Sequence, residues 1–152
     1  MLYLEYERIK DKYVKVQRLY DSILSEKEEI FQRTQPKSTM GEYEREFDKH
    51  IKVGSGGGSK DSLMEQYVIA IEQKRVNERL DEAKSILTDR MTLLKQVEHE
   101  LRRDKRTDNQ LYVMRYIDRM KIKQISAITH YSEPHIYRRL RIIKDTIKDD
   151  KK

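Results

Sequence analysis

The chain has no cysteine and no tryptophan, and only two prolines and five glycines among its 152 residues. Without cysteine there is no disulfide bridge, no thiolate zinc ligand and no cysteine nucleophile. Glycine and proline are the residues that most often interrupt helices, and four of the five glycines lie between residues 54 and 58. The sequence therefore predicts an all-α fold.

Long apolar runs and a signal peptide are also lacking. No run approaches the length of a membrane span, and the first ten residues, MLYLEYERIK, carry acids where a signal peptide needs a basic and then an apolar stretch. We therefore expect a cytoplasmic protein that makes no contact with a membrane.

The net charge of +6 is unevenly distributed along the chain. From Arg102 onward there are 15 Lys and Arg against 7 Asp and Glu, a balance of +8, whereas the preceding residues carry 18 against 20, a balance of −2. A concentrated basic segment is typical of proteins that neutralise nucleic-acid phosphates, because a charge that served only solubility would be spread along the chain.

Two long segments carry heptad patterns, one from Leu2 to about Arg33 and one from Ser59 or Asp61 to about Asp104. At 1.5 Å per residue these helices would be about 48 and 65 Å long. We expect a long antiparallel helical hairpin or a coiled-coil arm over residues 1–104, which serves oligomerisation or partner binding. The heptad positions are Tyr6, Ile9, Tyr13, Val16, Tyr20, Ile23 and Ile30 in the first helix, and Val76, Leu80, Ala83, Leu87, Leu94, Val97 and Leu101 in the second.

The connection between these helices contains Pro36, Gly41 and the sequence GSGGGS at residues 54–59. Tyr43 and Phe47, four residues apart, favour a short helix over residues 43–51. The glycine-rich stretch is expected to be flexible and is either a natural loop or an engineered linker. No strand precedes it and the Walker pattern is absent, so it is not predicted to bind phosphate.

The segment 107–148 has the pattern of a helix-turn-helix domain. Thr107 and Gln110 have the spacing of a capping box ahead of a supporting helix over residues 111–119. Ser132 is the predicted N-cap of the last helix, with its hydroxyl accepting from the N–H of His135, and Pro134 fits in the first turn. The residues expected to hold the three helices together are Ile125, Ile128, Ile136 and Leu140.

The helical period places long polar side chains of the last helix away from the face that carries Ile136 and Leu140. In a helix-turn-helix the second helix enters the major groove, and arginine can donate two hydrogen bonds to guanine. The alternative is a solvated basic face with no ligand. Cations that end the second long helix are either DNA-backbone contacts or partners of the helix dipole. The predicted DNA-binding residues are Ser132, His135, Tyr137, Arg138, Arg139, Arg141, Lys144, Lys121, Lys123, Arg102, Arg103, Lys105 and Arg106.

Catalytic chemistry is not predicted. His130 and His135 lie five apart across a turn, which matches neither a metalloprotease helix nor a zinc finger, and Glu98, His99 and Glu100 point in different directions on one helix. We expect no enzymatic activity, no cofactor and no metal site.

Residues 116–140 resemble the helix-turn-helix of bacterial sigma factors, region four. The matching residues are Tyr116, Ile125, Ser126, Ile128, Tyr131, Ser132, Ile136, Arg139 and Leu140, with His130 in place of the usual turn glycine. The order of a long helical half, a glycine-rich break, a heptad helix and a C-terminal helix-turn-helix is similar to the RinA and ArpU group of phage late-gene regulators. That resemblance implies an activator of phage morphogenesis or packaging genes, acting in the cytoplasm of a bacterial host cell.

Three functions remain open from the sequence. The first is a sequence-specific regulator that binds double-stranded DNA as a homo-oligomer, with a dimer favoured. The second is a phage small terminase subunit, although those proteins usually place the DNA-binding domain before the assembly helices. The third is a helical adaptor that binds RNA polymerase.

Overall fold

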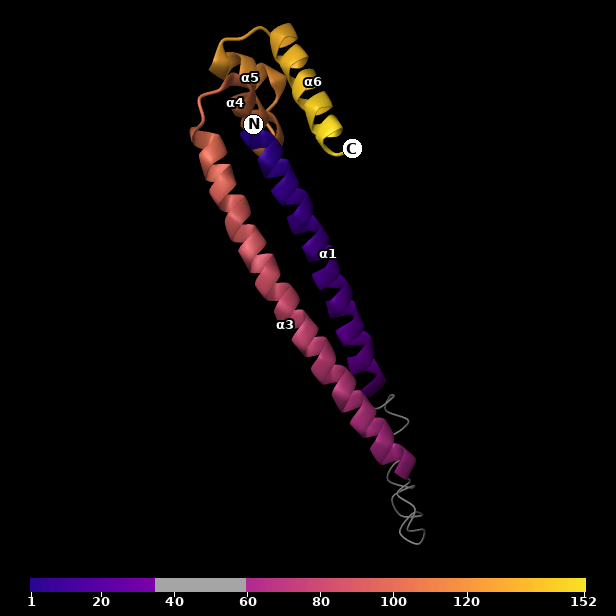
Figure 1. Ribbon diagram of the computed structural model, residues 1–152. Coiled ribbons are helices and arrows are strands. Elements are labelled where there is room, and N and C mark those ends of the chain that lie inside the picture. The colour runs from indigo at the N-terminus through magenta and orange to yellow at the C-terminus, as the bar shows by residue number, and fades with distance from the viewer. Residues whose placement is uncertain (35–59) are drawn as a thin grey trace. The chain divides into compact units, whose positions relative to one another are not determined.

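The computed structural model describes residues 1–34 and 60–152. Within these ranges every element is a helix and there is no strand, which confirms the all-α prediction (Figure 1). The short helix expected over residues 43–51 and the glycine-rich loop lie outside the described residues. The elements are α1 (Leu2–Thr34), α3 (Lys60–Arg103), α4 (Thr107–Tyr112), the π-helix η2 (Val113–Ile117), α5 (Ile122–Thr129) and α6 (Glu133–Asp150).

The chain divides into two compact units, and α1 and α3 each contribute to both. We call residues 1–16 and 86–152 the helix-turn-helix unit, and the described part of residues 17–85 the arm unit. The sequence predicted a domain boundary near residue 105. The structure places residues 86–104 in the same unit as the C-terminal helices, and the first sixteen residues pack with those helices as well.

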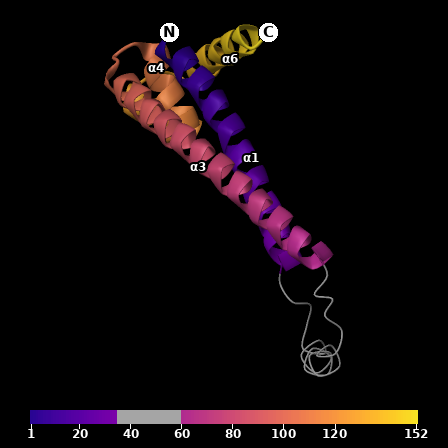
Figure 2. The ribbon, with the colours of Figure 1, turned by 60° about the horizontal axis from the view of Figure 1, so that its bottom comes forward.

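The arm unit is an antiparallel pair of helix segments. Glu26 of α1 pairs with Arg79 of α3 at 2.9 Å, and Arg33 pairs with Glu72 at 3.5 Å, so rising numbers in α1 meet falling numbers in α3. Figures 1 and 2 show the two helix segments of the arm unit side by side in both views. These exposed ion pairs contribute little to stability, so the buried seam holds the pair. Its core residues are Ile23, Ile30, Val76 and Ala83, with Tyr20 and Leu80 packed against them.

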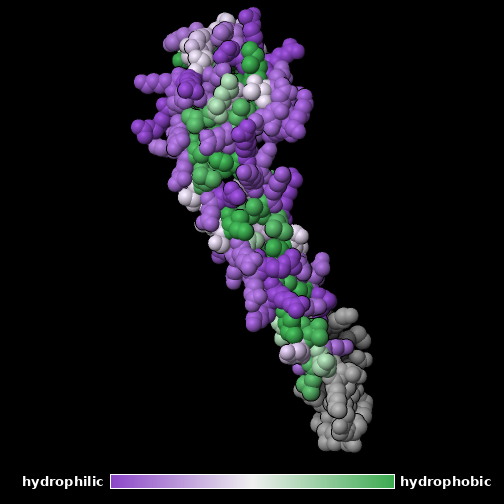
Figure 3. Space-filling view, in the orientation of Figure 1, coloured by the Kyte–Doolittle hydropathy of each residue, from purple (hydrophilic) through white to green (hydrophobic). Residues whose placement is uncertain are grey.

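The surface of α1 and α3 is mostly charged, and Figure 3 shows apolar side chains as separate patches among polar ones. Phe31 and Leu24, seven residues apart on α1, are among the exposed apolar side chains of the arm unit, at 56% and 38%. They lie beside the seam rather than within it, as the heptad spacing requires.

The core of the helix-turn-helix unit gathers buried side chains from α1, α3, α4, η2, α5 and α6. Ile125 and Ile136 have no exposed surface, and Leu140 is buried, so three of the four residues expected to hold the domain together do so. Burial of an isoleucine of this kind stabilises the fold by about 1.5–3 kcal/mol. The prediction for Ile128 is wrong, because its side chain is 53% exposed. Ile128 lies in the last turn of α5 and lines an open groove together with Leu101 and Met114.

The first turns of α1 complete this core through a group of tyrosines. The ring of Tyr112 lies 5.6 Å from that of Tyr3 in a stacked arrangement and 6.0 Å from that of Tyr6 at an angle of 69°. Its hydroxyl donates a hydrogen bond to the carboxylate of Glu7. Burial, and then the bond to Glu7, raises the pKa of Tyr112 above its ordinary value. Residues more than a hundred positions apart are thereby joined in one packed cluster.

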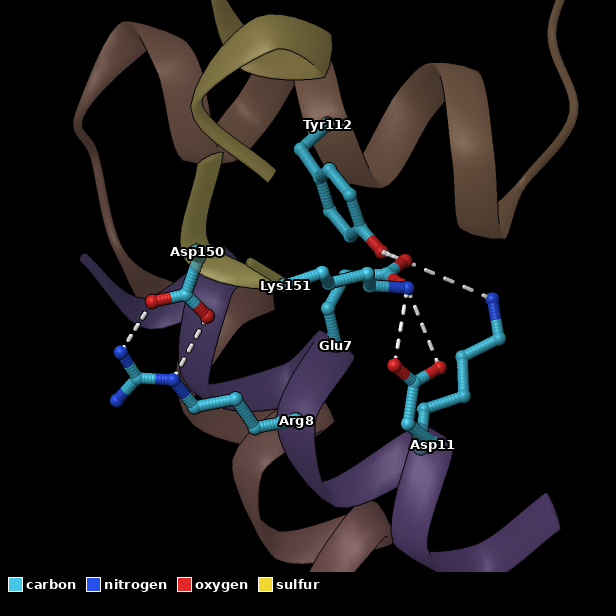
Figure 4. Close-up of polar contacts among 7 residues, drawn as sticks. Glu7, Arg8, Asp11, Tyr112, Asp150 and Lys151 are labelled. Atoms are coloured by element: carbon cyan, nitrogen blue, oxygen red, sulfur yellow. Dashed lines mark hydrogen bonds and ion pairs between the residues drawn. The ribbon is translucent and has the colours of Figure 1, made fainter. Parts of the chain in front are cut away.

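The end of α6 is also tied to α1, as Figure 4 shows. The guanidinium of Arg8 holds the carboxylate of Asp150, with its Nε 2.8 Å from Oδ2. Lys151 pairs with Asp11 at 3.0 Å and with Glu7 at 3.4 Å. The hydrogen bond from Arg8 lowers the pKa of Asp150, and the bond to Asp11 raises the pKa of Lys151. The C-terminal end of α6 is therefore fixed against α1 by paired charges as well as by the core.

Candidate nucleic-acid interface

The turn between α5 and α6 contains a residue in the left-handed conformation. His130 adopts φ 59° and ψ 16°, the left-handed conformation in which glycine is usual. Its N–H donates to the carbonyl of Ser126 at 2.9 Å, and the Ser126 hydroxyl donates to the carbonyl of Tyr131 at 2.6 Å. His130 therefore holds a left-handed position that glycine could also adopt.

The start of α6 agrees with the sequence prediction in position and differs in one bond. Ser132 is the N-cap, with an extended backbone, and Pro134 lies in the first turn. However, the Ser132 hydroxyl makes no capping hydrogen bond, so the predicted bond from the N–H of His135 is wrong. Pro134 removes one of the two N–H groups that a cap serves, and the exposed Ser132 hydroxyl is free to bond water.

The supporting helix starts and ends earlier than predicted, because α4 and η2 together run from Thr107 to Ile117 whereas a helix over residues 111–119 was expected. Arg106, rather than Thr107, is the N-cap of α4, so the predicted capping box does not form. The Arg106 N–H donates instead to Asp104 Oδ1 at 2.8 Å. A reciprocal arrangement does form at α5, where the N–H of Lys121 donates to Gln124 Oε1 and the N–H of Gln124 donates to the carbonyl of Lys121, both at 2.9 Å. The start of α5 is therefore well fixed.

The outer face of α6 carries cations that face solvent. Ile136 and Ile143 are fully buried on the inner face, and the helical period turns Arg138 and Arg141 to the opposite side. Neither arginine has a hydrogen bond or ion pair to another residue within the part of the chain that the structure describes. The exposed residues that the sequence predicted on this helix are His135, Tyr137, Arg138, Arg141 and Lys144, with Ser132 at its start.

Two of the predicted DNA-binding arginines already have partners in the protein. Arg139 donates from Nε and Nη2 to the two carboxylate oxygens of Asp108, at 2.9 and 2.8 Å, and so joins α6 to α4. Arg102 donates to Glu98 and Asp118, each at 2.9 Å, and these bonds, that to Asp118 first, raise its pKa. Both arginines therefore hold helices together in the free protein.

The remaining predicted contacts lie in two short segments that flank the supporting helix. Arg103, Lys105 and Arg106 are exposed at the end of α3 and the start of α4. Lys121 and Lys123 are exposed at the start of α5. Among the described residues none of these five side chains makes an ion pair, so their charges are free for an anionic ligand.

The sequence did not reveal the acids that define this surface. Asp108 and Asp118 lie 31 and 16 residues from their arginine partners, distances at which local spacing carries no signal. Asp145 is exposed on the outer face of α6, one turn beyond Arg141.

Nothing in the described ranges gathers three or more His, Asp or Glu side chains in a way that could hold a metal ion. Over the same residues, no helix has both the length and the apolar character that a membrane crossing needs. No family model matches the chain, and neither curated proteins nor solved structures include one that matches it.

Proposed function

We propose that this chain is a sequence-specific DNA-binding transcriptional regulator that places α6 in the major groove of double-stranded DNA. The observation that carries the proposal is the outer face of α6, where exposed Arg138 and Arg141 lie opposite the buried Ile136 and Ile143. A helix with free, donor-rich side chains over its first turns, placed after a left-handed turn, suits direct contact with base edges.

The exposed polar side chains divide into two roles by position. His135, Arg138 and Arg141 come from the first three turns of α6, which suits hydrogen bonds to bases. Lys121 and Lys123, at the start of α5, suit contacts with phosphates, which position the protein without specifying sequence. Arg103, Lys105, Arg106 and Lys144 extend the phosphate-binding surface, while Tyr137 can pack against a thymine methyl group or a sugar.

The narrower assignment is a late-gene activator of phage or prophage origin. It rests on the resemblance of residues 116–140 to sigma region four and on the order of helical segments. A homo-oligomer is part of this assignment, and we favour a dimer because two helix-turn-helix units can then occupy two half-sites. Contact with RNA polymerase belongs to this assignment, as does action in the bacterial cytoplasm.

The salt dependence of DNA binding tests this function. Binding to a duplex should weaken steeply as salt rises, because each neutralised phosphate releases counterions. Arg138→Ala and Arg141→Ala should each cost about 1–3 kcal/mol on a preferred sequence. The control is Arg75→Ala, which removes an equal charge from an exposed position in the arm unit. Equal losses for Arg138→Ala and Arg75→Ala would contradict a role for α6 in binding.

A further inference from the structure

An aromatic contact lies at the start of the exposed face of α6. The ring of Tyr131, in the turn before α6, lies 5.1 Å from the imidazole of His135, the third residue of the helix, with 43° between the two planes. Both residues are exposed, so the contact is made at the surface and outside the buried core. The distance lies in the range over which aromatic rings attract each other. The turn therefore provides a side chain that holds the ring of His135.

The backbone of Tyr131 is itself fixed by the end of α5. Its carbonyl accepts a hydrogen bond from the hydroxyl of Ser126 at 2.6 Å, and its N–H donates to Thr129 Oγ1 at 3.4 Å. The Thr129 hydroxyl donates in turn, at 2.7 Å, to the carbonyl of Ile125, which has no exposed surface. These hydrogen bonds join Tyr131 to the core, so its ring approaches His135 from a defined position.

The ring of Tyr131 restricts an otherwise unpaired side chain. Among the residues that the structure describes, the imidazole of His135 makes no hydrogen bond or ion pair, and the contact with Tyr131 is its one ring contact. An exposed side chain without such a contact changes rotamer within nanoseconds, and fixing it at the moment of binding costs affinity. A ring already held in one orientation avoids that cost and aims its N–H in one direction.

The direction of the imidazole N–H matters for which base it selects. Imidazole carries at least one N–H in either protonation state. In the major groove guanine presents two acceptors, O6 and N7, whereas adenine presents an amino group beside its N7. A fixed N–H aimed at O6 and N7 accepts guanine and rejects adenine, but a ring that rotates freely can bond to the N7 of either purine.

We infer that Tyr131 is a positioning residue that sets the base preference of His135, and that the preferred base is guanine. The ring of Tyr131 acts through the imidazole and needs no contact with DNA of its own. This inference rests on the proposed DNA-binding function. It adds to that function the base that His135 reads and a residue outside α6 that determines the reading.

The test is the base preference of the full chain at each position of its selected duplex. His135→Ala identifies the position that His135 reads, where discrimination of guanine from adenine should fall about tenfold with the loss of one hydrogen bond. Tyr131→Leu should lose the same discrimination at that position alone, whereas Tyr131→Phe keeps the ring and should retain it. Combining Tyr131→Leu with His135→Ala should cost no more than His135→Ala alone, because the two side chains act as one unit.

A measurement on the free chain tests the ring contact without DNA. The NMR shifts of the imidazole protons of His135 should move in Tyr131→Leu, because the ring current of the tyrosine is lost. The matched control is Tyr137→Leu, since Tyr137 is 59% exposed on α6 and makes no ring contact within the described chain. It should leave both these shifts and the guanine preference unchanged. All three variants should keep the helical circular dichroism of the parent chain.

The possible failures can be told apart. Unchanged imidazole shifts in Tyr131→Leu overturn the inference at the level of the contact. A Tyr131→Leu chain that keeps the guanine preference, binds all duplexes equally more weakly, or changes a position that His135→Ala leaves intact overturns it and leaves DNA binding by α6 standing. A preference other than guanine at the position lost in His135→Ala also overturns it. If the parent chain enriches no sequence at all, the proposed function fails and this inference fails with it.

Discussion

Arg139 provides the sharpest single test of how the structure assigns roles on α6. The sequence placed it among the DNA-binding residues, whereas the structure gives it two parallel hydrogen bonds to Asp108, at 2.9 and 2.8 Å. We expect Arg139 to position α6 on α4, and Arg138, its neighbour on the exposed face, to contact DNA. Replacing each arginine by methionine removes the same charge and a similar length of side chain, so the two variants form a matched pair.

The magnitude follows from the exposure and geometry of the Arg139 pair. The Arg139 and Asp108 side chains are 37% and 22% exposed, so the attraction between them is partly screened by water. Fully exposed pairs contribute about 0.2–1 kcal/mol, and a bidentate geometry places this pair towards the upper end of that range. A double-mutant cycle with Arg139→Met and Asp108→Ala should therefore give a coupling free energy of about 1 kcal/mol.

The assay combines unfolding in urea with DNA binding under conditions in which each variant is folded. Tyrosine fluorescence reports unfolding because the chain has ten tyrosines and no tryptophan, and several of them pack in the helix-turn-helix unit. Arg139→Met should lower the free energy of unfolding and reduce DNA affinity only slightly. Arg138→Met should leave the free energy of unfolding nearly unchanged and reduce DNA affinity strongly. The reasoning is refuted if Arg139→Met leaves unfolding unchanged and loses as much sequence-specific affinity as Arg138→Met.

Three further predictions concern the turn and the junction between α1 and α6. His130→Gly should raise the free energy of unfolding by about 0.5–1 kcal/mol, because glycine adopts the left-handed conformation without strain; destabilisation in urea would contradict the turn geometry. Tyr112→Phe should lower the free energy of unfolding by about 1–2 kcal/mol, since Glu7 loses a part-buried donor and keeps only its ion pairs with Lys10 and Lys151; an unchanged melting temperature would count against that bond. Because Arg8 lowers the pKa of Asp150 below 3.8, their pairing is complete above that value and is lost as the pH falls through the lower folded pKa. Amide exchange in the last turn of α6 should rise over that acid range in the parent chain and should already be raised near neutral pH in Arg8→Ala; equal exchange in both would contradict the pairing.

The sequence predicted the parts of this fold that depend on local spacing. The heptads of the two long helices gave the antiparallel arm, and the positions of Ile125, Ile136 and Leu140 gave the core of the helix-turn-helix unit. Each of these depends on which side chains share one face of one helix, and the helical period determines that directly. The N-cap at Ser132 and the place of Pro134 were predictable for the same reason.

The parts that were missed depend on contacts between distant segments. Nothing in the heptad pattern shows that Tyr3 of α1 packs against Tyr112, or that Asp108 is the partner of Arg139. Ile128 follows Ile125 at helical spacing and was expected in the core, yet its side chain is 53% exposed at the edge of a groove. The roles of individual arginines were equally hidden, because a guanidinium held by an acid and one facing solvent have the same sequence pattern.

The central claim is that the exposed face of α6 recognises a DNA sequence. Selection of bound duplexes from a random library, at physiological salt, tests it most directly. The account predicts that the parent chain enriches one sequence, and that Arg138→Ala or Arg141→Ala relaxes the preference at a single base position while Arg75→Ala retains it. If the parent chain enriches no sequence, or if the Arg138 and Arg141 variants enrich the same sequence unchanged, the account is contradicted.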